Sequence, residues 1–279
     1  MKNMKKILSL MLALVMMLAL ASCGSAGSGA ASGSATGSGS AAEDASDLAY
    51  VKDKGTLIVG ITDFKPMDYK NDAGEWVGFD ADMATAFAKS LGVDVQFIEI
   101  DWDNKIMELN AKSIDCVWNG MTLTDEVKKS MATSNPYCDN AQVVVVPADK
   151  ADQYQDVDSL KDLSFAVESG SAGEAEAKNQ NLTYTSVSTQ SDAVMEVSSG
   201  ASDACVIDLL MAGAIIGEGT SYPKLTHTVK LNSEQYGAAF RTDSDLAEVL
   251  NKFLADSYKD GSMQKIAETY GVQESLIAQ

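Results

Sequence analysis

Aromatic and polar side chains stand where several predicted strands of this chain end. Trp102 follows the alternating run 93–97, and Asn119 and Thr122 follow the apolar run 114–118. An indole, an amide and a hydroxyl offer a flat surface and hydrogen-bonding groups, and in open α/β sheets ligands bind beyond the carboxyl ends of strands. These residues therefore indicate a site that holds a small molecule.

The elements around these residues are predicted to be successive βα units. Apolar residues recur at helical spacing up to residue 91, with Asp80 and Asp82 expected to supply the N-cap and an acidic first turn, and Gly92 ends this helix. Asp103 is expected to cap a second helix, and Thr124 leads into a third. Two βα steps in so short a stretch predict a mostly parallel sheet.

A second set of alternating elements follows residue 158. Strands are predicted at 163–167 and 204–207, with a small-residue loop at 170–173 and helices that begin at Glu174 and after Ser191, the expected cap. The later strand ends on Asp208, much as the run 114–118 ends at Asn119. This echo predicts two lobes of similar topology, each presenting a strand end to a shared cleft.

The residue pattern does not support a metal centre or a Ser-His-Asp triad. The sequence has one histidine, His227, in a strand-like run, and it lacks paired cysteine spacing. Cys116 and Cys205 fall in apolar runs typical of a core, and no disulfide is expected among these two and Cys138. The net charge of −19 argues against nucleic acid or an anionic membrane face as a partner. No cofactor and no metal are expected.

The N-terminal segment is predicted to be a lipoprotein signal peptide, residues 1–22. Lysines precede an apolar run at 7–21, which is too short for an ordinary membrane span and suits a signal peptide. The small residues before Cys23 look like a lipobox, which implies lipidation of Cys23; the alternative is a plain secretory signal. Residues 24–42 contain only Gly, Ala, Ser and Thr, so 23–46 is expected to be a flexible tether. The protein is thus expected to be extracytoplasmic and lipid-anchored to the cell membrane.

The body from 55 to 271 resembles the extracellular solute-binding proteins of family 3, the polar-amino-acid receptors of bacterial ABC importers. The resemblance rests on short motifs in order: GFD at 78–80, DWD at 101–103, GMTLT at 120–124, SNPY at 134–137, SGS at 169–171, YG at 236–237 and KDG at 259–261. It implies an α/β fold, the two-lobed periplasmic-binding-protein-like fold of type II, with a ligand cleft between hinge-linked lobes. Lobe 1 would be 47–142 and 237–279, and lobe 2 would be 143–236, with hinge crossings near 142–146 and 236–239.

The resemblance also implies a set of ligand-binding residues. Phe64 and Trp102 match the aromatic positions that sandwich the ligand side chain, although both are also candidates for the core. Asn119, Gly120 and Thr122 match the strand-end positions that hydrogen-bond an α-carboxylate.

Two further matches lie in the predicted second lobe. Ser171 matches a donor at a helix start, where free N–H groups favour an anion, and Asp208 matches the acid that receives the α-ammonium. Thr122 and Ser171 also remain open as simple helix caps, and Asp208 as a solvated loop residue.

Two positions depart from the family pattern. Val127 stands where the family usually carries an arginine that is bidentate to the α-carboxylate, and Glu168, at a pocket-facing position, adds a carboxylate near Asp208. The predicted pocket then has two acids and no base. It favours a ligand with positive charge, or at least without net negative charge: a basic amino acid or a related amine ahead of a neutral amino acid, which remains the alternative if Glu168 points to solvent.

The implied function is capture of this solute by a monomer without catalysis and its delivery, by hinge closure, to an ABC transporter permease. Two alternatives stay open. The first is a lyase on the same fold, a cyclohexadienyl-type dehydratase, in which Glu168 would serve as general acid if burial raised its pKa. The second is a sensory ligand-binding domain. The lipobox and tether favour the importer.

Overall fold

The computed structural model of this protein describes residues 46–279. The predicted signal peptide, the lipidated Cys23 and all of the tether except Ser46 lie outside the described residues. Ser46 belongs to the folded body, where its hydroxyl accepts from Ala49 N at 3.0 Å and caps α1 (Asp47–Lys54). From residue 46 onward, no helix has both the length and the apolar character that a membrane crossing requires.

The first sheet within residues 46–279 has six strands. β1 (Thr56–Ile61) lies between β4 (Asp94–Glu99) and β5 (Cys116–Thr122), all parallel. β13 (Glu234–Phe240) runs antiparallel to β5 and pairs with β6 (Ala132–Thr133) and β7 (Cys138–Asn140). The sheet is therefore parallel at β4, β1 and β5, as predicted, and antiparallel beyond β5.

Helices and a short hairpin complete this part of the molecule. α2 (Phe79–Leu91) packs on β4 and β5 and against α9 (Ser262–Tyr270), which follows α8 (Leu246–Asp260) after a break at Gly261. α3 (Lys105–Asn110) and α4 (Asp125–Ser130) are short, and β2 (Tyr69–Lys70) pairs with β3 (Trp76–Val77). We call the part built on the first sheet lobe 1.

The second sheet, likewise counted within residues 46–279, has five strands. Its order is β10 (Thr183–Val187), β9 (Ser164–Glu168), β11 (Ala204–Asp208), β8 (Gln142–Pro147) and β12 (Leu225–Lys230). β9, β10 and β11 are parallel, whereas β8 is antiparallel to β11 and to β12. α5 (Ala172–Asn179), α6 (Gln190–Ser199) and α7 (Leu209–Ile215) accompany these strands. We call this part lobe 2.

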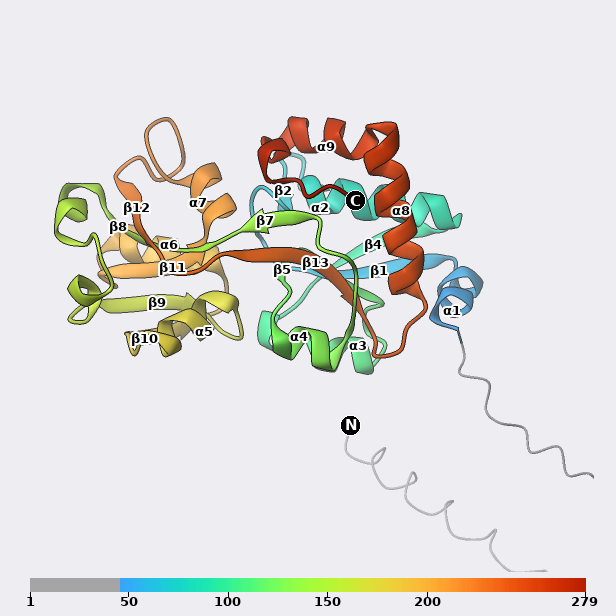
Figure 1. The fold of residues 1–279 in the computed structure, drawn as a ribbon, viewed down its shortest axis with the longest axis horizontal. Helices are drawn as coiled ribbons and strands as arrows, with labels where there is room; N and C mark the ends of the chain where they lie inside the picture. The colour runs from blue at the N-terminus through green and yellow to red at the C-terminus, as the bar shows by residue number, and fades with distance from the viewer. Residues whose placement is uncertain (1–45) are drawn as a thin grey trace, which may run out of the picture. The chain divides into compact units, whose positions relative to one another are not determined.

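Two segments connect the lobes, and they lie side by side. β7 leads directly into β8, and β12 leads into β13, while β7 and β13 pair through Glu234 with Asn140 and Tyr236 with Cys138. Figure 1 shows β13 and the chain around β7 running together between the group β8–β12 and the group that contains β1, β4 and β5. The pairing assigns residues 234–236 to the first sheet, a few residues before the predicted return to lobe 1 at 237.

The caps of several helices differ from the prediction. Gly78, at φ 135°, is the N-cap of α2, and Asp80 is fully buried inside the first turn rather than capping it. Asp103 lies in a 3-10 turn (Trp102–Asn104) and caps no helix, because α3 begins at Lys105 without a side-chain cap. Thr189, not Ser191, caps α6 and accepts from Asp192 N at 3.0 Å. Thr124 leads into α4, as predicted, and is its N-cap, accepting from Val127 N.

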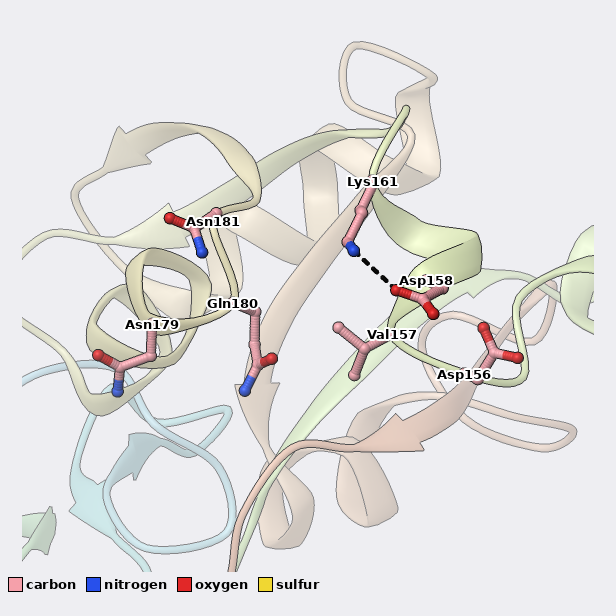
Figure 2. A pocket seen from close by; sticks show the side chains of 7 residues that line it. All are labelled: Asp156, Val157, Asp158, Lys161, Asn179, Gln180 and Asn181. Carbon is pink, nitrogen blue, oxygen red and sulfur yellow. Dashed lines mark hydrogen bonds and ion pairs between the residues drawn. The ribbon is translucent and has the colours of Figure 1, made fainter.

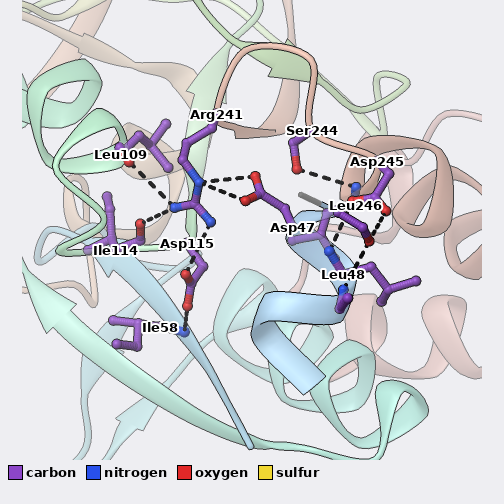
Figure 3. A network of polar contacts seen from close by, with 12 residues as sticks. Asp47, Leu48, Ile58, Leu109, Ile114, Asp115, Arg241, Ser244, Asp245 and Leu246 are labelled. Atoms are coloured by element: carbon purple, nitrogen blue, oxygen red, sulfur yellow. Dashed lines mark hydrogen bonds and ion pairs between the residues drawn. The ribbon is translucent and has the colours of Figure 1, made fainter. Parts of the chain in front are cut away.

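A buried ionic network joins the start of the described chain to lobe 1 (Figure 3). Arg241 Nε lies 3.0 Å from Asp47 Oδ2, and its Nη1 donates to the carbonyl of Ile114 at 2.9 Å. Its Nη2 lies 3.3 Å from Asp115 Oδ1, whose other oxygen accepts from Ile58 N and from Lys54. The network ties α1 to β1, β5 and the end of β13 at once.

Candidate functional site

A cavity of about 460 Å³ lies between the two lobes, at the carboxyl ends of strands from both sheets. The structure places all eight sequence-predicted site residues on its lining: Phe64, Trp102, Asn119, Gly120, Thr122, Glu168, Ser171 and Asp208. Three of them follow strands β1, β4 and β9, three are in the second half of β5, and the two acids are the last residues of β9 and β11. The structure thus brings them together, while the ligand contact of each stays a prediction.

The apolar wall of the cavity is buried rather than exposed. Phe64 and Trp102 both line the cavity and are both largely covered by neighbouring side chains. Phe64 meets Tyr236 edge to face with ring centroids 6.3 Å apart, and Trp102 packs in one apolar cluster with Val127 and Met121. These two aromatic rings therefore serve the core and the cavity together, and Val127 completes the wall with an aliphatic surface.

The floor of the cavity is held by an amide whose hydrogen-bonding capacity is filled. Asn119 Oδ1 accepts from Thr62 N at 3.0 Å and Thr62 Oγ1 at 2.8 Å, and its Nδ2 donates to Thr62 O at 3.1 Å and Asp68 Oδ2 at 2.8 Å. The backbone N–H of Gly120 donates to Asp80 Oδ2 at 2.6 Å. Both groups therefore position β5 and leave no side-chain donor of Asn119 for a ligand.

Two fully buried carboxyls lie beneath that floor. Burial raises the pKa of Asp80 to about 7, against the opposing hydrogen bonds from Gly120 N–H and the Tyr137 hydroxyl. Burial, together with neighbouring Asp80, raises the pKa of Asp68 well above its usual value. Two like charges at close range repel each other, so each of these carboxyls keeps its proton to a higher pH than a solvent-exposed aspartate does.

Polar residues of the connecting strands meet at one side of the cavity. Thr122 donates its hydroxyl proton to Glu234 Oε1 at 2.8 Å, and the same oxygen accepts from Asn140 at 2.7 Å and Gln142 at 2.8 Å. Asn140 also donates to Asp208 Oδ1 at 2.5 Å. The Thr122 hydroxyl is thereby committed to Glu234, a residue of β13 that the sequence reasoning did not include.

Asp208 ends β11 inside this network. Its Oδ1 also accepts from the Tyr236 hydroxyl at 2.6 Å, and its Oδ2 accepts from Gln190 at 2.6 Å. The side chain is 3 % exposed, so the alternative of a solvated loop residue does not hold. Burial first, and then Glu234, raise the pKa of Asp208 to about 7, against the hydrogen bonds that lower it.

Glu168, at the end of β9, is a second buried acid of the cavity. It is 3 % exposed, and its Oε1 has no hydrogen-bond partner within residues 46–279. Burial and then Asp208 raise the pKa of Glu168 to about 8, while Lys105 works in the opposite direction. A buried carboxyl with an unused oxygen carries a desolvation penalty that a bound donor relieves.

The expectation of a pocket without a base is wrong, because Lys105 lines the cavity. Its Nζ donates to the carbonyls of Trp102 and Gly170, each at 3.0 Å, and lies 4.8 Å from the centroid of the Trp102 ring. Burial lowers the pKa of Lys105, and Glu168 is the first of the acids that raise it. The sequence carried one signal for this residue: a lysine three positions after Trp102, at helical spacing from the predicted site.

Ser171 is both a lining residue and the N-cap of α5. Its Oγ accepts from Glu174 N at 3.0 Å, which leaves its hydroxyl proton available. Glu174 in turn accepts from Gly170 N at 2.8 Å, so the first turn of α5 already holds one carboxylate of its own. The cap expected for Ser171 is thus present, and its position on the cavity lining is present as well.

Other features of the described chain offer less to a ligand. No cluster of three or more metal-binding side chains occurs between residues 46 and 279. Cys116, Cys138 and Cys205 are buried and unpaired in that part of the chain.

A second depression, of about 650 Å³, lies on lobe 2 (Figure 2) and shares no lining residue with the cavity. Its lining is Asp156, Val157, Asp158, Lys161, Asn179, Gln180 and Asn181. Its one ion pair, Lys161 Nζ to Asp158 Oδ1 at 2.7 Å, joins side chains that are largely exposed to solvent. Exposed ion pairs of this kind contribute little free energy, because water screens their charges. The buried cavity between the lobes is therefore the better candidate for ligand binding.

Comparison with known proteins is consistent with this geometry. The family of bacterial extracellular solute-binding proteins, family 3, matches residues 57–273. The L-cystine-binding protein TcyJ of Escherichia coli (strain K12) is 29% identical over 231 residues, which cover 81% of this chain and 86% of that protein. The arginine-binding extracellular protein ArtP of Bacillus subtilis (strain 168) is 30% identical over 226 residues, 78% of this chain and 86% of that protein.

Solved structures show the same two-lobed arrangement. A mutant of the arginine-binding protein ArgBP from T. maritima superposes with a TM-score of 0.76 at 33% identity, covering 81% of this chain and 99% of that one. The ancestral amino acid-binding protein AncCDT-1, described as a precursor of cyclohexadienyl dehydratase, gives a TM-score of 0.74 at 34% identity with the same coverage. The predicted α/β fold with two lobes is confirmed.

Proposed function

The chain belongs to the bacterial extracellular solute-binding proteins, family 3, and from this membership we propose that it captures an amino acid or related amine that carries a positive group. One observation supports the positive group above the others: the cavity encloses two buried acids, Glu168 and Asp208, and one oxygen of Glu168 has no partner within residues 46–279. A cationic donor relieves both the desolvation and the repulsion of this pair.

The arrangement suits a cation even though both acids hold protons readily. The pKa values of Glu168 and Asp208 are raised to about 8 and about 7, so a large fraction of each carboxyl is protonated at neutral pH before a ligand binds. An ammonium or guanidinium group that enters favours their ionised forms, so capture of a cation is coupled to the release of protons. A ligand without a positive group gains nothing from this exchange.

Delivery is proposed to follow the route of the family. The lobes close on the ligand about the paired segments that carry β7 and β13, with lobe 1 as 47–142 and 237–279 and lobe 2 as 143–236, and the closed form engages the permease of an ABC importer. The signal peptide, lipidated Cys23 and tether, proposed from the sequence, keep the monomer at the outer face of the cell membrane.

Calorimetric titration of the purified protein tests the proposed ligand class. Arginine, lysine, glutamine, glutamate and simple alkyl amines are titrated separately at pH 7.5. We expect micromolar or tighter binding of at least one cationic member and at least a tenfold preference over glutamate. Tight binding of glutamate or aspartate together with no binding of any cation would contradict the proposal.

A second candidate function is a lyase that acts on a cyclic polycarboxylate. Glu168, with a pKa raised to about 8, retains a proton at neutral pH and has the chemistry of a general acid, and AncCDT-1 is among the similar structures. We favour binding without turnover, because the similar proteins TcyJ and ArtP are named as binding proteins and Val127 removes the cation that the family usually offers to a carboxylate. Incubation with prephenate, followed by ultraviolet absorbance, distinguishes the two: measurable turnover that Glu168→Gln abolishes would establish the lyase.

A further inference from the structure

We propose that Lys105 is the residue that binds the ligand's carboxylate, so that the cavity selects a zwitterion with Lys105 at one end and Glu168 at the other. This inference rests on the proposed function and deepens it, since it concerns which amines the same cavity accepts. Lys105 and Glu168 both line the cavity, and each is buried to more than nine-tenths, with 8 % and 3 % of the residue exposed.

The three lobe 1 residues that the family resemblance assigned to a carboxylate, Asn119, Gly120 and Thr122, have their donors engaged within the protein. Both Asn119 Nδ2 protons go to Thr62 O and Asp68 Oδ2, the Gly120 N–H goes to Asp80, and the Thr122 hydroxyl proton goes to Glu234. Each of the three side-chain acceptors is itself a carboxylate, so a second anion would have to compete for a charge-assisted hydrogen bond. A carboxylate therefore needs another donor in this cavity.

Val127 does not supply one. It lies on the cavity lining, but its side chain packs with Trp102, Leu109 and Met121 in an apolar cluster. The cationic anchor that the family usually has at this position is replaced by a surface without hydrogen-bonding capacity.

Lys105 has the capacity that Val127 lacks. An ammonium group has three N–H donors, and the structure engages two of them, on the carbonyls of Trp102 and Gly170 at 3.0 Å each. The Trp102 carbonyl lies in lobe 1 and the Gly170 carbonyl in lobe 2. These two hydrogen bonds hold the ammonium group at the junction of the lobes, and its third N–H remains for a ligand. A fixed ammonium loses less side-chain entropy on binding than a free lysine does.

The two charged groups of the proposed site are linked through one loop, since Lys105 contacts the segment that follows Glu168. Glu168 is the last residue of β9, and Gly170, which accepts from Lys105, follows two residues later. Ser171 comes next, with a hydroxyl proton that remains free to assist a carboxylate beside Lys105. An α-amino acid with a cationic side chain thus meets an ammonium and a hydroxyl at one end, and at the other a Glu168 oxygen that has no partner among residues 46–279.

Paired ligands that differ only in the carboxylate test this role. Arginine is compared with agmatine, and lysine with cadaverine, by calorimetric titration of the unmodified protein and of Lys105→Met. We expect Lys105→Met to weaken the amino acid of the tighter pair about 10- to 100-fold and its decarboxylated partner less than about threefold, since a hydrogen bond to a charged group is lost in the first case alone.

Two further variants separate charge from folding. Lys128→Met removes an exposed lysine of α4 that does not line the cavity and controls for net charge; it should change neither pair. Lys105→Arg keeps the charge and the donors and should keep the preference for the amino acid over the amine, even if Lys105→Met folds poorly.

The outcomes are distinguishable from failure of the proposed function. If the unmodified protein binds the amines but prefers them to the amino acids, or if Lys105→Met weakens both members of a pair equally, Lys105 is an inter-lobe clasp and the inference is wrong while the proposed function stands. If the unmodified protein binds no member of either pair, the inference is overturned, and the proposed function is overturned with it only if the simple alkyl amines also fail to bind.

Discussion

Glu168 shows how much a buried acid influences a cavity when one of its oxygens has no hydrogen-bond partner in the described part of the chain. The groups that face it are Asp208 and Asp192, which raise its pKa, and Lys105, which lowers it, but burial is the largest cause of the rise to about 8. The folded protein therefore keeps a proton on Glu168 over a pH range in which the unfolded chain has lost it. Within that range, from about 4.5 up to about 8, each increase in pH favours unfolding.

We expect Glu168→Gln to change how the thermal stability of the protein depends on pH. The glutamine is neutral at every pH, so the variant should unfold at nearly the same temperature as the unmodified protein at pH 5 and at a higher temperature at pH 8. Half of the rise in the pKa of Glu168 corresponds to a gain of about 2 kcal/mol in the free energy of unfolding at pH 8. For a chain of this size that gain raises Tm by about 4–8 °C. Thermal unfolding followed by circular dichroism across pH 5–9 measures the difference.

The matched control is Glu218→Gln, in an exposed loop before β12. Its difference from the unmodified protein should not change with pH. A Glu168→Gln variant that lost stability relative to the unmodified protein on going from pH 5 to pH 8 would show that the carboxylate is ionised and stabilising in the folded state.

Individual site residues were predictable from the sequence to different degrees. The positions that line the cavity follow from strand ends and motif spacing, since both are local features of the chain. The commitments of Asn119 and Thr122 are not local: they depend on Asp68, which lies in another loop, and on Glu234, which is 112 positions away along the chain. Lys105 was missed because a lysine on a short helix normally faces solvent, and its burial arises from Gly170 of the other lobe.

At the scale of elements, strands were easier to predict than helix ends. The apolar runs that became β5, β9 and β11 are strongly hydrophobic and end at polar residues. Helix starts were assigned to the nearest carboxylate or hydroxyl, and this failed at Asp80 because Gly78 adopts a positive φ and Asp80 is drawn inward by Gly120 and Tyr137. Tertiary hydrogen bonds overrode the local capping preference there.

Strand β5 depends on one glycine that a larger residue cannot replace. Gly120 has φ +55°, and a Cβ atom at this position would lie 2.2 Å from Phe64 Cε1. Gly120→Ala should therefore displace the Phe64 ring, cost about 2–3 kcal/mol of stability and weaken ligand binding at least about tenfold. Chemical denaturation and calorimetry with the tightest ligand measure the two effects.

Gly200→Ala is the control for backbone strain alone. Gly200 ends α6 at φ +80°, and nothing lies within 4 Å of the added Cβ. It should cost about 1 kcal/mol without any change in affinity. Equal effects of the two variants on binding would show that the contact with Phe64 does not shape the cavity.

At the scale of the whole molecule, the Arg241 network links segments that are far apart in sequence (Figure 3). Arg241 contacts Asp47 and Asp115 and is itself buried, so its removal leaves Asp47 without a cation and leaves Asp115 with Lys54 alone. We expect Arg241→Met to lower the free energy of unfolding by about 3–5 kcal/mol, the usual effect of breaking a buried pair on one side. Urea denaturation of the purified protein measures this loss.

The exposed pair of Lys252 and Asp256 on α8 provides the comparison, with its nitrogen and oxygen 2.6 Å apart. Lys252→Met should lower the free energy of unfolding by less than about 1 kcal/mol. A loss of similar size in the two variants would mean that the Arg241 network is hydrated and contributes no more than a surface pair.

The same network is the route by which a pull from the proposed tether would reach the folded body. A pull on the chain at Ser46 acts first on α1, which begins at Asp47. Asp47 is paired with Arg241, the residue directly after β13 (Glu234–Phe240), so the force is transmitted to the first sheet. If the proposed tether holds the chain at Ser46, lobe 1 is the stationary part of the proposed closure and lobe 2 is the part that moves. Tension at Ser46 then does no work on the hinge, and ligand affinity should be independent of the applied force.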